Sequence, residues 1–199
     1  MVEKDSEAKS PEMDPRRESL IRKLKDPDEE VRQMAASALE RLDGMNNLPV
    51  ILERYRKGDK ETQLKAVYAL GKLGTDECLP ILIHALDHKE EEVRAASIRM
   101  LRELKNEKTL PALILKLNDQ SITIQTMVAE ALGEFRRRDL TRHLTPLLKK
   151  ENKYLLMAAM ESLGKLNALE AIDEIIKLLE HPAAEVRKTA AKVLGEFQT

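Results

Sequence analysis

Apolar residues recur along this chain with a fixed step of 31 residues. Four apolar columns keep that step through six copies, and one of them consists of Leu39, Leu70, Leu101, Leu132, Leu163 and Leu194. A constant period of about 20–50 residues is typical of repeat architectures. The columns divide the chain into an N-terminal tail, 1–13, which we expect to be flexible, and a repeat domain, 14–199. Its six repeats span 14–44, 45–75, 76–106, 107–137, 138–168 and 169–199.

Each repeat is predicted to form two helices joined by a short polar turn. In the first helix, apolar residues such as Leu82 and Leu86 stand four positions apart, as on an amphipathic helix. The second helix starts at a column that holds strong N-cap residues in four repeats. These are Asp28, Asp59, Ser121 and Asn152. Gly44 and Gly74 are expected to end second helices.

A single hairpin cannot bury its apolar face, whereas six stacked hairpins can. The sequence therefore predicts an all-α fold, an α-solenoid of six helix-turn-helix repeats. Glycines inside the second helices would cost stability unless a neighbouring helix packs closely against them. Such glycines are Gly71, Gly133, Gly164 and Gly195.

The charge balance restricts the classes of partner. Charged residues make up 35% of the chain, but 34 Lys and Arg stand against 35 Asp and Glu. Nucleic acids and anionic membranes both favour a positive surplus, so neither is expected as a partner. The chain has no apolar run long enough to span a membrane and no signal-peptide pattern, which favours a cytoplasmic protein.

The second-helix sequences DEEVRQMAASALERL and EEEVRAASIRMLREL resemble HEAT repeats, and in particular the short HEAT-like repeats named after phycobilisome lyases. In that family an Asp in the turn and an Arg six residues later form a ladder between successive repeats. The resemblance implies this structural role for Asp26, Arg32, Arg94, Asp119 and Arg187. Departures from the pattern predict that the ladder is interrupted around repeats 2 and 5.

No catalytic constellation is evident, so we expect neither an enzyme nor a cofactor. His84 and His88 stand four residues apart, but two ligands are too few for a metal site. Cys78, the single cysteine, lies near the start of a first helix and is interpreted as a partly buried structural residue.

In HEAT-like arrays the second helices line the concave face, where partners usually dock. Several apolar or amphipathic residues fall on this face, and in repeats 4 and 5 they replace the charged residues of other repeats. The candidate partner-binding residues are Leu64, Tyr68, Arg99, Ile122, Tyr154, Leu156 and Met157. Such a patch can mark an interaction site, or the adjoining repeat can bury it.

The sequence favours a non-catalytic scaffold that binds a protein or peptide on the concave surface. One alternative is an accessory subunit of a bilin lyase or chromophore-handling complex, which only the family resemblance suggests. Another is a HEAT-like DNA-binding or glycosylase protein, which the acidic column Glu30, Glu61, Glu92 and Glu185 opposes. The last repeat ends on Phe197 without a polar cap, so either self-association through this repeat or a partner that covers it is also expected.

Overall fold

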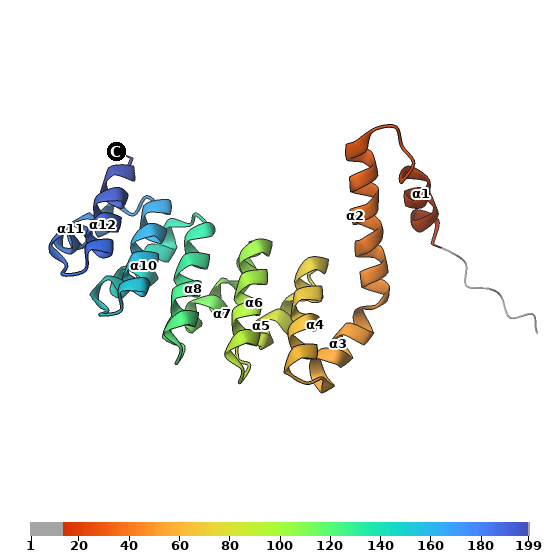
Figure 1. Cartoon of the computed structure of the whole chain (residues 1–199), viewed down its shortest axis with the longest axis horizontal. Coiled ribbons are helices and arrows are strands. Elements are labelled where there is room, and N and C mark those ends of the chain that lie inside the picture. The colour runs from red at the N-terminus through yellow and green to blue at the C-terminus, as the bar shows by residue number, and fades with distance from the viewer. Residues whose placement is uncertain (1–13, 199) are drawn as a thin grey trace, which may run out of the picture. The chain divides into compact units, whose positions relative to one another are not determined.

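The computed structural model of the chain describes residues 14–198, so the predicted tail at 1–13 lies outside the described residues. Twelve α-helices occur within residues 14–198 (Figure 1). They are α1 (Pro15–Lys23), α2 (Glu29–Asn46), α3 (Leu48–Lys57), α4 (Lys60–Leu73), α5 (Leu79–Ala85), α6 (Glu91–Leu104), α7 (Leu110–Leu115), α8 (Ile122–Glu134), α9 (Thr141–Leu144), α10 (Lys153–Lys165), α11 (Ile172–Lys177) and α12 (Ala184–Glu196).

The helices alternate as the 31-residue step predicts, so each repeat consists of one odd-numbered and one even-numbered helix. The first helices of the last three repeats are short and continue as 3₁₀ turns. These turns are Lys116–Asn118, Thr145–Lys149 and Leu178–Glu180. The all-α repeat fold predicted from the sequence is thus confirmed.

The chain divides into two compact units, Met1–Val50 and Ile51–Thr199. In the described part of the first unit, α1 packs against α2. The Arg17 Nε donates to Asp43 Oδ1 at 3.1 Å and links these two helices. Gly44 lies inside α2 rather than after it, so its prediction as a helix stop was wrong.

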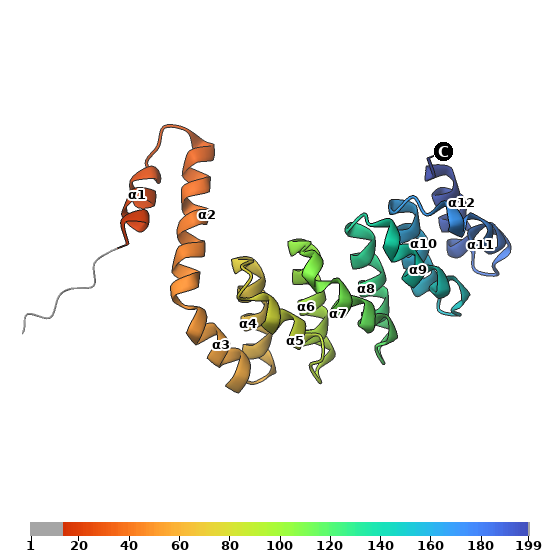
Figure 2. The same ribbon diagram turned by 180° about the vertical axis from the view of Figure 1, so that it is seen from behind.

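In the second unit, the helices α4, α6, α8, α10 and α12 lie side by side in chain order, each packed against the next. The first helices pack along the other side of this row, as the view from behind shows (Figure 2). The predicted leucine column is fully buried in repeats 2 to 5, at Leu70, Leu101, Leu132 and Leu163. The core therefore runs between the two rows of helices.

The polar turns begin the second helices as predicted. The side chains of Asp28, Asp59, Ser121 and Asn152 each accept a backbone N–H in the first turn of the helix that follows. Gly74 ends α4 with φ of 62°, a left-handed conformation that suits a residue without Cβ.

The helical glycines mark close contacts between consecutive repeats. A Cβ at Gly71 would meet the Met100 side chain, and one at Gly133 would lie 2.6 Å from Ser162 Oγ and 2.9 Å from Ser162 Cα. The Ser162 hydroxyl also donates to the Ala129 carbonyl at 2.8 Å, so α10 is tied to α8 at this point. Around Gly195 nothing lies within 4 Å.

We expect Gly133→Ala to destabilise the protein by about 1–3 kcal/mol, because the backbone of α10 must shift to admit the methyl group. Gly195→Ala is the matched control, and its higher helix propensity should raise stability by about 0.5–1 kcal/mol. Urea unfolding followed by circular dichroism measures both. Equal effects of the two substitutions would contradict the close packing of α8 on α10.

Candidate functional site

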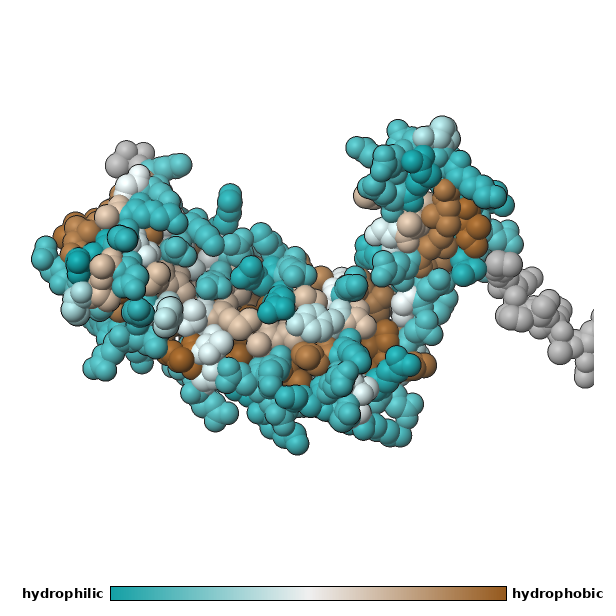
Figure 3. Space-filling model, in the orientation of Figure 1, coloured by the Kyte–Doolittle hydropathy of each residue, from teal (hydrophilic) through white to brown (hydrophobic). Residues whose placement is uncertain are grey.

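The even-numbered helices of the second unit expose a shared strip of small and apolar side chains. The strip consists of Leu64 on α4, Ala95 on α6, Thr126 on α8 and Met157 on α10, which are spaced by the repeat and are all half-buried. We call these four residues the second-helix strip. On this side of the molecule, pale and brown surface forms a band between hydrophilic margins (Figure 3). A ligand lying across the helices would contact one strip residue per repeat.

Aromatic residues flank the second-helix strip. Tyr68 lies one turn beyond Leu64, and its hydroxyl accepts a hydrogen bond from Arg99 Nη1 at 3.1 Å. Tyr154, three residues before Met157, is 63% exposed. The Lys153 ammonium lies 5.2 Å from the centre of the Tyr154 ring. Tyrosines in such positions offer a ligand both apolar surface and a hydroxyl group.

The carboxylates beside the strip are paired with lysines. Glu92 bonds Lys60 at 2.9 Å, Glu185 bonds Lys153 at 3.2 Å, and Glu61 bonds Lys65 at 2.6 Å. The hydrogen bond from Lys60 lowers the pKa of the Glu92 carboxyl group. The column that looks acidic in the sequence is therefore largely neutralised at these three positions.

Charge pairing continues on the other margin of the strip. Glu134 accepts a hydrogen bond from Lys165 at 2.8 Å, which lowers the pKa of the carboxyl group. Glu130 and Glu161 pair with Arg102 and Lys192 of neighbouring helices. Most of the charged side chains beside the second-helix strip already have an ion-pair partner. The strip therefore favours a ligand with apolar and neutral polar groups over a highly charged ligand.

Six of the seven candidate residues keep some exposure. Leu64, Tyr68, Arg99, Tyr154 and Met157 lie on or beside the strip, and Ile122 is exposed at the start of α8.

Leu156 is the exception, because it is only 1% exposed and its assignment to the partner-binding surface was wrong. Leu156 stands 31 residues after Gln125 in the ladder column, and that column points toward the following repeat. An apolar residue in this column is therefore buried by repeat stacking.

The ladder is present at two successive junctions of the second unit. Arg94 Nη2 donates to Asp119 Oδ1 at 3.0 Å, and both side chains are 5% exposed. Gln63 Oε1 bonds His88 Nε2 at 3.0 Å. The ladder therefore continues from repeat 2 to repeat 3, where the sequence predicted an interruption. His88 Nδ1 accepts the Glu90 N–H, and this assigns the proton to Nε2, which donates to Gln63.

Histidine thus replaces aspartate at the ladder position. Asp119 accepts the N–H of the residue two positions on, at Ser121, and His181 does the same at Ala183. The sequence shows the replacement, but the equivalent geometry becomes evident only in the structure.

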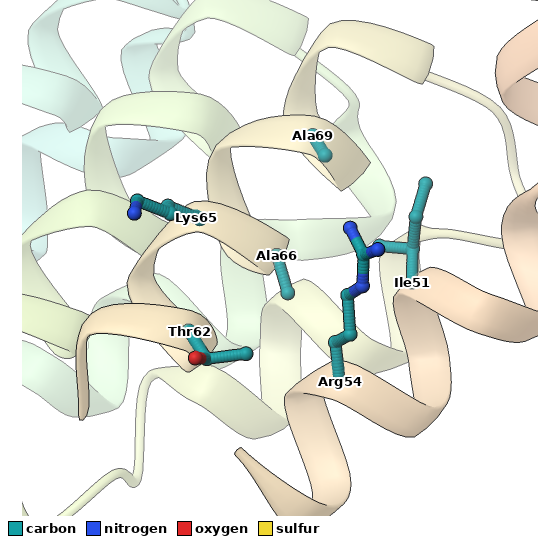
Figure 4. A pocket seen from close by; sticks show the side chains of 6 residues that line it. All are labelled: Ile51, Arg54, Thr62, Lys65, Ala66 and Ala69. Carbon is teal, nitrogen blue, oxygen red and sulfur yellow. The ribbon is translucent and has the colours of Figure 1, made fainter. Parts of the chain in front are cut away.

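Sequence reasoning missed a hollow between α3 and α4 that has two cationic side chains, Arg54 and Lys65, in its lining. Its volume is about 240 Å³, and the residues that line it are Ile51, Arg54, Thr62, Lys65, Ala66 and Ala69 (Figure 4). In repeats 3 to 6 the Thr62 column holds fully buried apolar residues, namely Val93, Ile124, Leu155 and Val186. A comparison of Arg54 and Lys65 with the residues at the same positions of the following repeats could have revealed the cationic side chains at this end of the second unit.

The histidines and the cysteine have structural partners. Tyr55 and His84 share a hydrogen bond of 3.0 Å between the hydroxyl group and Nδ1, and burial raises the pKa of Tyr55. Cys78 is buried, with its sulfur 3.4 Å from Thr75 Oγ1. Within residues 14–198, no three His, Cys, Asp or Glu side chains are grouped as metal ligands.

In the described part of the chain, no helix has the length and apolar character needed to cross a membrane.

Several solved structures are similar to this chain, all below 25% identity, which shows the fold alone. The complex of CpcE and CpcF of phycocyanin lyase from Nostoc sp. is 24% identical with a TM-score of 0.53, covering 98% of this chain and 81% of that chain. A designed armadillo repeat protein in complex with the peptide (KR)4 is 17% identical with a TM-score of 0.57, covering 90% and 98%. The protein YibA of Escherichia coli is 21% identical with a TM-score of 0.64, covering 89% and 69%.

No curated protein sequence matches the chain significantly. The family model described as HEAT repeats matches residues 48–115, 79–153 and 141–199, and the model of the HEAT repeat matches residues 17–42. These matches cover well over half of the sequence, and they agree with the paired helices and with the Arg94–Asp119 ladder. The chain therefore belongs to the HEAT repeat family.

Proposed function

We propose that this protein is a non-catalytic scaffold whose second-helix strip binds an extended segment of a partner protein. The observation that carries the proposal is the continuity of the strip, which places one half-buried, uncharged side chain on each of four successive helices. Accessible apolar surface with polar margins is typical of peptide-binding grooves.

The spacing of the helices indicates what kind of segment fits. Packed helices lie about 8–10 Å apart. A polyproline II chain has three residues per turn and rises about 3.1 Å per residue, so its turn matches that spacing. A segment with one apolar side chain in every three residues would therefore place an apolar group over each strip residue.

The charges beside the strip further define the segment. The carboxylates of Glu92 and Glu134 already bond lysines, so a basic peptide would have to compete with these pairs. The hydroxyl groups of Tyr68 and Tyr154 remain suitable for hydrogen bonds to a peptide backbone. We infer a segment with little net charge, in contrast to the peptide (KR)4 bound by the similar designed armadillo protein.

The bilin-lyase alternative rests on the family resemblance, and the likeness to the CpcE–CpcF complex extends to the fold alone. A bilin absorption band that shifts on mixing with the protein would favour it.

The proposal predicts that the double substitution Tyr154→Ser with Met157→Ser weakens peptide binding by at least about tenfold, since it removes an interfacial tyrosine and its apolar neighbour. The probes are peptides with an apolar residue at every third position. They are selected from a displayed random library for binding to the 199-residue chain. Fluorescence anisotropy of the labelled peptides measures their affinities.

The matched control is Leu115→Ser, because Leu115 is 72% exposed but lies on α7, a first helix. Its affinity for the selected peptides should equal that of the unmodified protein. Failure to select any such peptide, or equal losses in both variants, would reject the second-helix strip as the binding site.

A further inference from the structure

We propose that copies of this chain associate head to tail, with repeat 1 of one copy stacking on repeat 6 of the next. The contact would continue the 31-residue repeat across two molecules, and Arg187 of one copy would pair with Asp26 of the other. This surface is separate from the second-helix strip.

The ladder arginine of repeat 6 has the same local geometry as that of repeat 3. Arg94 Nη1 donates to the carbonyl groups of His88 and Lys89 in its own turn, at 2.9 and 3.1 Å. Arg187 Nη1 donates to the equivalent carbonyl groups of His181 and Pro182, at 2.8 and 2.9 Å.

The two arginines differ in their contacts beyond the turn. Arg94 also reaches Asp119 of the following repeat, 25 residues on. Arg187 is exposed, and among residues 14–198 no carboxylate lies within ion-pair distance of it. It is therefore oriented for an aspartate that a following hairpin would provide.

On α11 and α12, apolar residues are also more exposed than their counterparts in earlier repeats. Leu179 is half-buried, although its counterparts Leu86, Leu117 and Leu148 are buried. Ala191 is exposed, although its column is completely or almost completely buried in repeats 2 to 5, at Val67, Ile98, Ala129 and Met160. Gly195 has open space where Gly133 touches the next helix. Repeat 6 therefore has the side chains of an internal repeat on its outer face.

Repeat 1 has a complementary face. Asp26 occupies the same column as Asp119 and has the same local bond, because its Oδ1 accepts the Asp28 N–H at 3.2 Å. Its Oδ2 bonds Lys23 of the same repeat at 2.7 Å, a pair that Arg187 of another copy would join or displace. Val31 is exposed on α2, whereas its counterparts in repeats 3 to 6 are fully buried. Met34, one turn later, is 70% exposed. An acidic ladder residue is thus adjacent to uncovered apolar surface.

The corresponding face of repeat 2 does not match repeat 6. Its ladder position is Lys57, which has the same charge as Arg187, and its hollow contains Arg54 and Lys65. Charge complementarity therefore favours repeat 1 of a second copy as the partner that covers the outer face of repeat 6. Because the two surfaces differ, the contact is heterologous and leads to a ring or an open chain of copies.

Sedimentation velocity of the 199-residue chain over a wide range of concentrations tests the proposal. We expect the average mass to rise with concentration. Arg187→Glu and Asp26→Arg should each weaken association by at least about tenfold, because each places like charges together. Lys89→Glu, an exposed change in the turn of repeat 3, should have no effect.

Mixing the two charge-reversed variants keeps the test independent of folding defects. In the mixture, Arg187 of one variant meets Asp26 of the other, and the two reversed residues also meet, so association should recover. A strictly monomeric unmodified chain, association that neither reversal weakens, or a mixture that stays monomeric would overturn the proposal. If Arg187→Glu unfolds the last hairpin, Asp26→Arg alone must still weaken association by at least about tenfold.

Discussion

Replacing Asp119 with alanine is expected to lower the free energy of unfolding by about 3–5 kcal/mol, because it leaves the charge of Arg94 buried without its carboxylate. Water cannot easily take the place of that carboxylate, since both side chains are 5% exposed. The Nε of Arg94 is already buried without a hydrogen-bond partner within the described residues. The substitution also removes the acceptor of the Ser121 N–H at the start of α8.

Asp76→Ala is the matched control for this prediction. Asp76 bonds Lys108 of the following repeat at 2.5 Å, but both side chains are more than 60% exposed. Solvent screens such pairs, and their loss costs about 1 kcal/mol or less. Denaturant titrations of both variants, with slopes compared to detect partial unfolding, provide the measurement. Equal losses would show that the buried ladder has no special importance.

A double substitution separates the loss of the ion pair from the loss of packing. Arg94→Leu combined with Asp119→Leu should recover most of the stability lost in Asp119→Ala, because apolar residues can replace a buried ion pair at little cost. The chain contains half of this replacement, since a buried leucine, Leu156, occupies the arginine position of the ladder in repeat 5, while His181 stands at the aspartate position of repeat 6.

Leu156→Ala is expected to destabilise the protein by about 2–5 kcal/mol, which is the usual cost of truncating a fully buried leucine. The cost arises from lost burial and from the cavity left behind. The exposed Tyr154, two residues earlier, provides the control, because Tyr154→Ala should change stability by about 0.5 kcal/mol or less. Thermal and urea unfolding distinguish the two. A small effect of Leu156→Ala would place this side chain at the surface, as the sequence suggested.

The sequence predicted the repeats because their signals are local or periodic. Caps such as Asp59 and Asn152 act on the next turn of the chain, so residue type and position suffice to identify them. The buried leucine column follows from the constant step, which gives every repeat the same surroundings. Gly44 was misread because helix ends depend on the backbone that follows, and α2 continues through this residue.

The candidate site was predicted less completely, since exposure depends on the neighbouring repeat. Leu156 and Met157 are adjacent in the sequence and both apolar, but only Leu156 is buried, whereas Met157 is half-buried. The bond between Gln63 and His88 was also missed, because neither residue matches the family pattern alone. Their partnership becomes evident only when both side chains are placed in space.

The most direct test of the proposed function is methyl NMR of the chain with the tightest peptide selected from the library. Each residue of the second-helix strip has a methyl group, so Leu64, Ala95, Thr126 and Met157 can each report contact. The account predicts that their signals shift on titration, while the methyl groups of Leu115 on α7 stay unchanged. Shifts confined to first-helix residues such as Leu115, with the strip unaffected, would contradict it.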